Sequence, residues 1–147
     1  MPIGELCTRQ TVVAPRGTSV YQAAKLMRQY HVGDLIVTDH VNGKPIGIVT
    51  DRDIVIEILA QDLDPSGISV DEIMSQDLVV MREHEGLFET IEKMRAKGIR
   101  RMPVVNVEGK LVGIVAVDDL IKILAEELDA LAKLISREQR HEAELRT

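Results

Sequence analysis

The apolar and polar positions in the first half of the chain predict the element order β-α-β-β-α. An extended segment over 11–14 comes first, and apolar strands follow at 35–37 and 46–49, joined by a turn at Asn42-Gly43. Between the extended segment and the first of these strands, apolar residues spaced three and four apart predict an amphipathic helix. Ser19 and Gln22 resemble a capping box at its start. The buried face of this helix is expected to be Val20, Ala23, Ala24, Met27 and Tyr30. A second helix over 53–60 closes the unit.

The second half of the chain repeats this pattern. Residues 3–8 match residues 70–75 at an offset of 67, and one residue dropped near Val41-Asn42 makes the later offset 66. The repeat predicts an extended segment at 78–81, a helix that buries Leu87, Ile91 and Met94, strands at 102–105 and 111–115, and a helix from Asp118. A unit of about sixty residues is marginally stable alone. We therefore expect a mixed α/β (α+β) fold of two pseudo-symmetric units packed through their sheets.

The repeat also divides the chain into domains. The first domain is expected over 1–61, a linker containing Pro65-Ser66-Gly67 over 62–69, the second domain over 70–126 and a helical extension over 127–147. An apolar seam runs along the last helix through Ile121, Leu124, Leu128, Leu131 and Ile135. Its spacing, alternately three and four residues, allows contact with a second subunit beyond Leu128. From Ser136 onward the chain is polar on all sides, so we expect an exposed, frayed tail.

Composition narrows the function classes. The net charge is −6 without a basic stripe, and aromatic residues make up only 2%, which argues against a nucleic-acid partner. No apolar run is long enough to span a membrane. The single Cys7 fits a reducing, cytoplasmic setting. Scattered histidines predict no metal site, and the absence of a phosphate-binding loop or a nucleophile–base pair argues against an enzyme and against a catalytic cofactor.

Two heptapeptides carry a resemblance to a known family. Gly47-Ile48-Val49-Thr50-Asp51-Arg52-Asp53 and Gly113-Ile114-Val115-Ala116-Val117-Asp118-Asp119 stand at equivalent strand-to-helix junctions of the repeat. They resemble the Gly-x-x-(Thr/Ser)-x-x-Asp signature of CBS domains, and the whole of 3–125 is similar to a tandem CBS pair, the Bateman module. Residues 99–105 support the resemblance.

The chemistry of the first signature allows two interpretations. Thr50 and Asp53 lie three residues apart at a helix start, where the carboxylate can accept hydrogen bonds from both ribose hydroxyls and the threonine hydroxyl can donate to a ribose or phosphate oxygen. The exposed N–H groups of a helix start also favour an anion. The same two residues serve equally well as a helix cap. The two interpretations are compatible.

The resemblance implies two clefts between the copies that bind an adenosyl compound. The first cleft is implied to use Ile48, Thr50, Arg52, Asp53, Val79, Ile99 and Arg100. The second is implied to use Val12, Val32, Gly33, Arg101, Ile114, Ala116 and Asp119.

The clefts are expected to be unequal. Ala116 stands where the family carries Thr or Ser, while Arg101 is placed to meet a phosphate and its first-copy counterpart, Asp34, would repel one. AMP is the favoured ligand, with ATP, ADP, NAD(H) and S-adenosylmethionine as alternatives. The resemblance further implies a homodimer that signals to a separate effector protein by a change of conformation. The alternative function is a scaffold for dimerisation, with degenerate clefts and no ligand.

Overall fold

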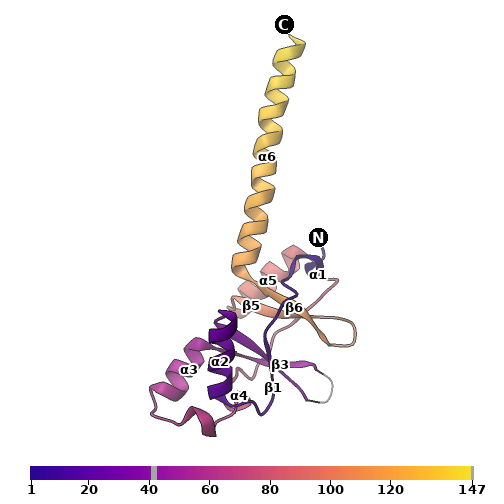
Figure 1. Cartoon of the computed structure of the whole chain (residues 1–147). Helices are drawn as coiled ribbons and strands as arrows, with labels where there is room; N and C mark the ends of the chain where they lie inside the picture. The colour runs from indigo at the N-terminus through magenta and orange to yellow at the C-terminus, as the bar shows by residue number, and fades with distance from the viewer. Residues whose placement is uncertain (41–42, 147) are drawn as a thin grey trace. The chain divides into compact units, whose positions relative to one another are not determined.

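The computed structural model describes residues 1–40 and 43–146, so Asn42 of the predicted turn lies outside the described residues. Two compact units are present, Met1–Val115 and Ala116–Thr147, and each is described by itself. The elements of both copies follow the predicted order, which confirms the α/β class (Figure 1).

The sheet of the first copy contains three strands with β2 at its centre. Strand β2 (Asp34–Thr38) pairs in parallel with β1 (Val13–Pro15) and antiparallel with β3 (Pro45–Thr50). Leu35 and Val37 belong to the core cluster of this copy, whereas Ile36 points to the opposite face and is 1% exposed. Both faces of β2 are therefore covered, as a sheet that packs between two layers requires.

Helix α2 (Val20–Tyr30) covers one face of this sheet. The Ser19 hydroxyl accepts a hydrogen bond from Gln22 N at 3.1 Å and begins the helix. Val20, Ala23 and Met27 are buried as predicted. Burial of Ala24 and Tyr30 was predicted wrongly, because the buried stripe is narrower than the sequence pattern and Tyr30 is the last helical residue. Tyr30 is 53% exposed.

The second helix differs in its bounds and its geometry from the prediction. Helix α3 (Asp51–Ile54) begins two residues earlier than expected and continues as a π-helical turn, η1 (Val55–Leu59), in which Ala60 N donates to Val55 O at 2.9 Å. The run Ile54-Val55-Ile56 is β-branched throughout. Such side chains crowd the preceding turn of an α-helix, which favours a wider turn here.

The second copy repeats the first with smaller differences. Its sheet has the order β4-β5-β6, formed by β4 (Met81–Arg82), β5 (Arg101–Val105) and β6 (Leu111–Ala116). Helix α5 (Leu87–Lys97) buries Leu87 and Met94 and half-buries Ile91. It ends in a left-handed residue, Gly98, as α2 ends in left-handed His31 at the equivalent position.

The leading segments of the two copies, residues 3–8 and 70–75, cross over to the opposite copy. Thr8 exchanges backbone hydrogen bonds of 2.9 Å with Ile114 of β6, and Ser75 N donates to Ile48 O of β3 at 3.2 Å. Helix α1 (Ile3–Leu6) is thereby joined to the second copy and helix α4 (Val70–Ile73) to the first, where Val70 is part of the core cluster. The crossover ties the copies together.

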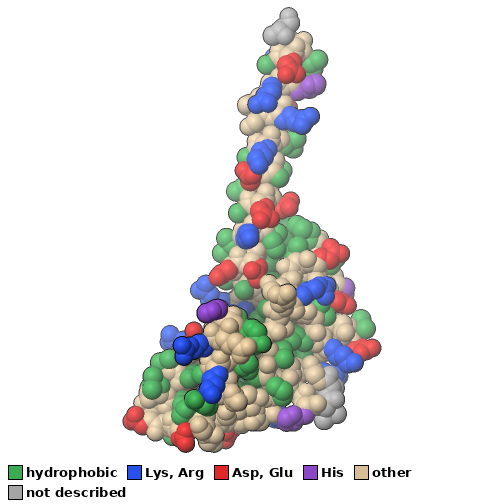
Figure 2. All heavy atoms as spheres, in the orientation of Figure 1, with side chains coloured by type: hydrophobic (Ala, Val, Ile, Leu, Met, Phe, Trp, Pro, Cys, Tyr) green, Lys and Arg blue, Asp and Glu red, His purple; other side chains and the backbone are tan. Residues whose placement is uncertain are grey.

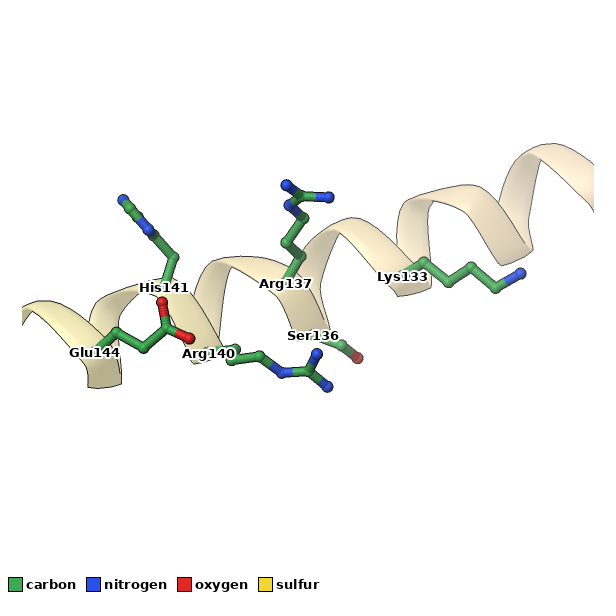
Figure 3. Close-up of a pocket in the computed structure, with 6 residues that line it drawn as sticks. All are labelled: Lys133, Ser136, Arg137, Arg140, His141 and Glu144. Carbon is green, nitrogen blue, oxygen red and sulfur yellow. The ribbon is translucent and has the colours of Figure 1, made fainter.

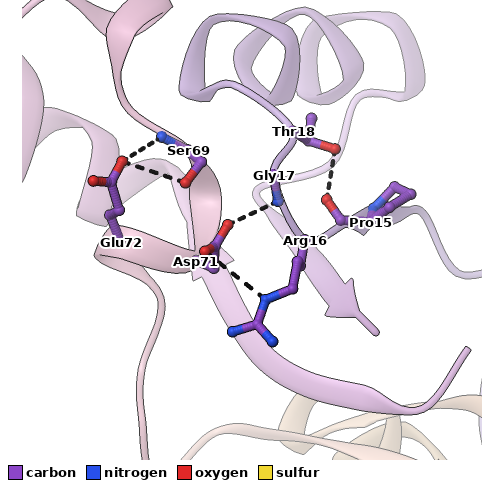
Figure 4. A network of polar contacts seen from close by, with 7 residues as sticks. All are labelled: Pro15, Arg16, Gly17, Thr18, Ser69, Asp71 and Glu72. Carbon is purple, nitrogen blue, oxygen red and sulfur yellow. Dashed lines mark hydrogen bonds and ion pairs between the residues drawn. The ribbon is translucent and has the colours of Figure 1, made fainter. Parts of the chain in front are cut away.

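An ordered linker supports this crossover. The predicted Pro65-Ser66-Gly67 segment is a short 3-10 helix, η2 (Pro65–Gly67). Just after it, an Asp71 carboxylate oxygen accepts a hydrogen bond from Gly17 N at 2.8 Å, and the other oxygen lies 4.0 Å from Arg16 Nε (Figure 4). The hydrogen bond to Gly17 is the main reason why the pKa of Asp71 is lowered. The turn after β1 and the start of α4 are thus held together.

The second unit is helix α6 (Val117–Leu145). It includes the predicted polar tail, which is exposed as expected but remains helical to Leu145 rather than frayed. Among the described residues, none of the helices combines the length and the apolar character needed to cross a bilayer.

Candidate functional site

Thr50 and Asp53 cap helix α3 at the end of strand β3. Asp53 N donates to Thr50 Oγ1 at 3.1 Å, and Thr50 N donates to Asp53 Oδ2 at 2.9 Å. This reciprocal pair satisfies two backbone N–H groups, so the capping interpretation is confirmed.

Capping leaves part of each side chain available for a ligand. The Thr50 hydroxyl acts only as an acceptor in the pair, so its hydrogen can still donate. Asp53 uses Oδ2 for the cap, so Oδ1 and the second lone pair of Oδ2 can still accept. Both residues are half-buried rather than enclosed. Such a carboxylate can accept hydrogen bonds from both hydroxyl groups of a vicinal diol.

The remaining first-cleft residues come from both copies. Ile48 lies in β3, half-buried, opposite Ile36 of β2 and bonded to Ser75. Val79 and Ile99 are half-buried and lie just before β4 and just after α5, while Arg52 and Arg100 are exposed. The hydrogen bond from Ser75 brings the segment that leads to Val79 to the edge of the first-copy sheet.

Arg101 forms an ion pair with the first copy. Its Nε lies 3.1 Å from Asp34 Oδ2, and Asp34 is the direct neighbour of Thr50 in the β2–β3 ladder. Arg101 was assigned by resemblance to the second cleft. Its guanidinium is in fact directed at the residue beside the first signature, and a phosphate at Arg101 would have to compete with the Asp34 carboxylate.

A second carboxylate lies beside this pair. Asp51 N donates to Gly33 O at 2.9 Å, and a Cβ added to Gly33 would lie 3.1 Å from Asp51 Oδ2. Burial raises the pKa of Asp34, Arg101 opposes that rise and the Asp51 charge adds to it. Gly33, expected to contact a ligand in the second cleft, is therefore next to the Asp51 side chain.

Three further second-cleft residues lie in the unit Met1–Val115 with structural contacts of their own. Val12 and Val32 are partly buried against the core cluster of the first copy, and Val12 O accepts from Ile36 N at 3.2 Å. Ile114 is half-buried and bonded to Thr8. These contacts account for apolar residues at the three positions without a ligand.

Ala116 and Asp119 lie at the start of the separate unit. Asp119 Oδ2 accepts a hydrogen bond from Ala116 N at 3.3 Å, the counterpart of the bond between Asp53 and Thr50. The reciprocal hydroxyl is missing because alanine has none. The second signature is thus half a capping box.

Two features of the site were not predicted from the sequence. Asp34 was expected to repel a phosphate and not to pair with Arg101, and no role was predicted for Asp51. A signal for the pairing was present, since opposite charges occupy equivalent positions of the repeat. Gly47 and Gly113 inside predicted strands were a signal for the crossover, because such glycines often mark close approach of another segment.

Comparison with known proteins was consistent with the resemblance. The family model described as CBS domain matches residues 3–60 and 70–126. An uncharacterized protein of Methanopyrus kandleri is 32% identical over 121 residues, and the match covers 82% of this chain and 61% of that protein.

Two solved structures are similar over most of the chain. The CBS domain pair of protein MJ0100, in complex with 5′-methylthioadenosine and S-adenosyl-L-methionine, is 26% identical with a TM-score of 0.75, over 86% of this chain and 98% of the other. CBS domain protein PAE2072 from Pyrobaculum aerophilum, complexed with AMP, is 29% identical with a TM-score of 0.73, over 81% of this chain and 89% of the other.

Proposed function

The chain belongs to the CBS domain family, and from that premise we propose that it is a regulatory module that binds an adenine nucleotide. AMP is the favoured ligand, and ATP, ADP, NAD(H) and S-adenosylmethionine are the alternatives. The observation that carries the proposal is the half-buried Thr50–Asp53 pair, which caps α3 and keeps a hydroxyl donor and a carboxylate acceptor for a ribose. Solved CBS proteins similar to this chain are described with AMP and with adenosyl compounds, which supports this ligand class.

The proposed first cleft is formed around β3 and α3. Asp53 receives the ribose hydroxyls, Thr50 donates to a ribose or phosphate oxygen, and Ile48, Val79 and Ile99 supply apolar surface for the purine. Arg52, exposed in the first turn of α3, supplies positive charge for the phosphate. We propose binding without turnover, so bound nucleotide should be recovered unchanged.

We further propose that the module works as a homodimer in the cytoplasm and signals to a separate effector protein. A ligand can shift the arrangement of the copies only as far as its affinities for the two arrangements differ. The Arg101–Asp34 ion pair and the crossed leading segments join the copies, so a ligand between them has contacts that it can strengthen or weaken.

A thermal-shift titration of nucleotide-free protein tests the proposal. AMP should raise the melting temperature with concentration, because a ligand that binds only the folded state stabilises it. Asp53→Asn keeps one oxygen for the cap but has neither the charge nor the second acceptor, so the midpoint of the titration should rise about tenfold or more.

Ser19→Ala is the matched control, because it removes a helix cap far from the signature in sequence. It should lower the melting temperature and leave the AMP midpoint unchanged. If none of these nucleotides changes the melting temperature of the wild-type protein, the dimerisation scaffold is favoured. Two observations already support that alternative: Arg101 is paired with Asp34, and Ala116 has no hydroxyl.

A further inference from the structure

We propose that the apolar seam of helix α6 binds the same seam of a second copy of this chain, with the two helices antiparallel. The seam consists of Ile121, Leu124, Leu128, Leu131 and Ile135, with Leu134 beside it. The inference specifies the surface for the homodimer part of the proposed function and does not depend on nucleotide binding.

The side chains of the seam are exposed, which favours their burial against a partner. Leu128 is 68% exposed, Leu131 58% and Ile135 57%, and the hydrophobic side chains can be followed along α6 in Figure 2. Six leucine and isoleucine side chains in one contiguous stripe expose on the order of 500 Å², the upper end of what monomers leave uncovered. A standard interface buries about 800 Å² on each partner. The seam alone supplies most of the area that a stable dimer needs.

The spacing of the seam suits a copy of itself. Intervals of three and four residues place the five seam residues at the a and d positions of a heptad repeat, the geometry that packs two identical helices knobs into holes. A charged side chain at an a or d position of such a pair would be buried without a partner, which is costly. The seam contains no charged residue from Ile121 to Ile135, and Ala125 and Ala132 beside it let a second helix approach.

The residues that follow the seam favour the antiparallel orientation. Glu138 and Glu142 continue the a and d positions after Ile135. In a parallel pair, each of these glutamates would lie against the same glutamate of the second copy, and the two charges would repel. An antiparallel pair instead sets Leu128 against Leu131 and Leu124 against Ile135, so neither glutamate meets its equivalent.

Charge along the helix points the same way. The first half of α6 carries Asp118, Asp119, Glu126, Glu127 and Asp129 against a single Lys122. The second half carries Lys133, Arg137 and Arg140, which extend from the helix in Figure 3, and balances them with Glu138, Glu142 and Glu144. Antiparallel pairing places the acidic half beside the partner's half of balanced charge, whereas parallel pairing places two acidic halves together.

Sedimentation velocity of the full chain without nucleotide tests the surface. Leu128→Glu buries a charge in the proposed interface, and Ala130→Glu adds the same charge on the opposite face of the same helix. The wild-type chain and Ala130→Glu should be dimers, and Leu128→Glu should dissociate about a hundredfold more readily. Circular dichroism should show equal helix content in both variants. A monomeric wild-type chain, or equal dimerisation of the two variants, would overturn the inference.

Disulfide trapping tests the orientation in a Cys7→Ala background. A mixture of the Leu124→Cys and Ile135→Cys chains should form the mixed disulfide, because the antiparallel pair brings these positions within bonding distance. A Leu124→Cys homodisulfide, or no disulfide at all, would overturn the antiparallel arrangement. If Leu128→Glu is monomeric and still stabilised by AMP, dimerisation and nucleotide binding are separate properties of the chain.

Discussion

Asp34 of β2 and Arg101 of β5 occupy equivalent positions of the internal repeat and form an ion pair with each other, with Arg101 Nε 3.1 Å from Asp34 Oδ2. When two copies pack about a pseudo-two-fold axis, equivalent positions close to that axis meet each other. Identical charges at such a position repel, and opposite charges attract. The divergence of the repeat at this position therefore stabilises the contact between the copies, and it also occupies the arginine that a phosphate would use.

Replacing Asp34 with Asn should tighten AMP binding by about three- to tenfold, since removing a partly exposed carboxylate near a phosphate is worth on the order of 1 kcal/mol. This prediction depends on the proposed function. Isothermal titration calorimetry with AMP and with adenosine measures the two affinities. Adenosine carries no phosphate, so its affinity should change little. An equal change for both ligands would indicate that the substitution alters the cleft and not the charge that the phosphate meets.

Gly113→Ala should destabilise the protein by about 1–3 kcal/mol, the usual cost of overpacking. A Cβ at Gly113 would meet the Thr8 carbonyl oxygen at 2.5 Å, and backbone joined by two hydrogen bonds cannot move away easily. At the equivalent Gly47, an added Cβ would first meet Met74 Sδ, which belongs to a flexible side chain. Gly47→Ala should therefore cost less.

Urea unfolding of the two alanine variants checks this difference. A larger loss of unfolding free energy for Gly47→Ala than for Gly113→Ala would mean that Met74 is held more rigidly than the Thr8 backbone. It would also contradict the view that the crossed segment at Thr8 needs a glycine on β6.

The sequence predicted the repeat well because each copy buries its own periodic face. Leu35, Val37 and Met27 are where the apolar pattern placed them. The crossover could not be read from periodicity, because Thr8 and Ser75 bond through backbone groups that every residue has. Tyr30 was misplaced for a related reason. An apolar residue in the last turn of a helix is buried only if the neighbouring segment covers it, and sequence spacing does not describe that neighbour.

The candidate site was predictable in part. Thr50 and Asp53 are local, three residues apart, and their pairing follows from the helix start alone. The contact of Arg101 with Asp34 joins residues 67 positions apart and depends on how the two copies pack. Residues whose role is set within one turn of helix could thus be assigned, and residues whose role depends on the other copy could be assigned only by resemblance.

Ala116→Thr should stabilise helix α6 by about 1 kcal/mol, because it supplies the hydroxyl that the half capping box lacks. Asp119 already accepts a hydrogen bond from Ala116 N, so only the reciprocal acceptor for Asp119 N is missing. Ala116→Val is the control, with the same branching and no hydroxyl. Chemical unfolding followed by circular dichroism should show a gain for threonine alone. Equal effects of the two substitutions would assign the change to shape and not to capping.

Asp71→Asn should destabilise the protein at neutral pH by on the order of 1 kcal/mol, with a loss that shrinks as the pH falls. The hydrogen bond from Gly17 N holds the pKa of Asp71 below its ordinary value of about 3.9. A carboxyl group whose pKa is lowered by folding stabilises the protein above its unfolded pKa, and that contribution disappears as the pH falls through the folded pKa. Asparagine keeps an oxygen for Gly17 but has no charge and does not titrate.

The difference in unfolding free energy between wild type and Asp71→Asn should therefore be constant from about pH 7 to 5 and decrease below about pH 4. Urea unfolding at several pH values measures it. Asp77→Asn removes an exposed carboxylate nearby in sequence and is the control, for which the difference should stay small throughout. A difference for Asp71→Asn that does not change with pH would mean that the contact with Gly17 stabilises the fold through its shape, with no contribution from the carboxylate charge.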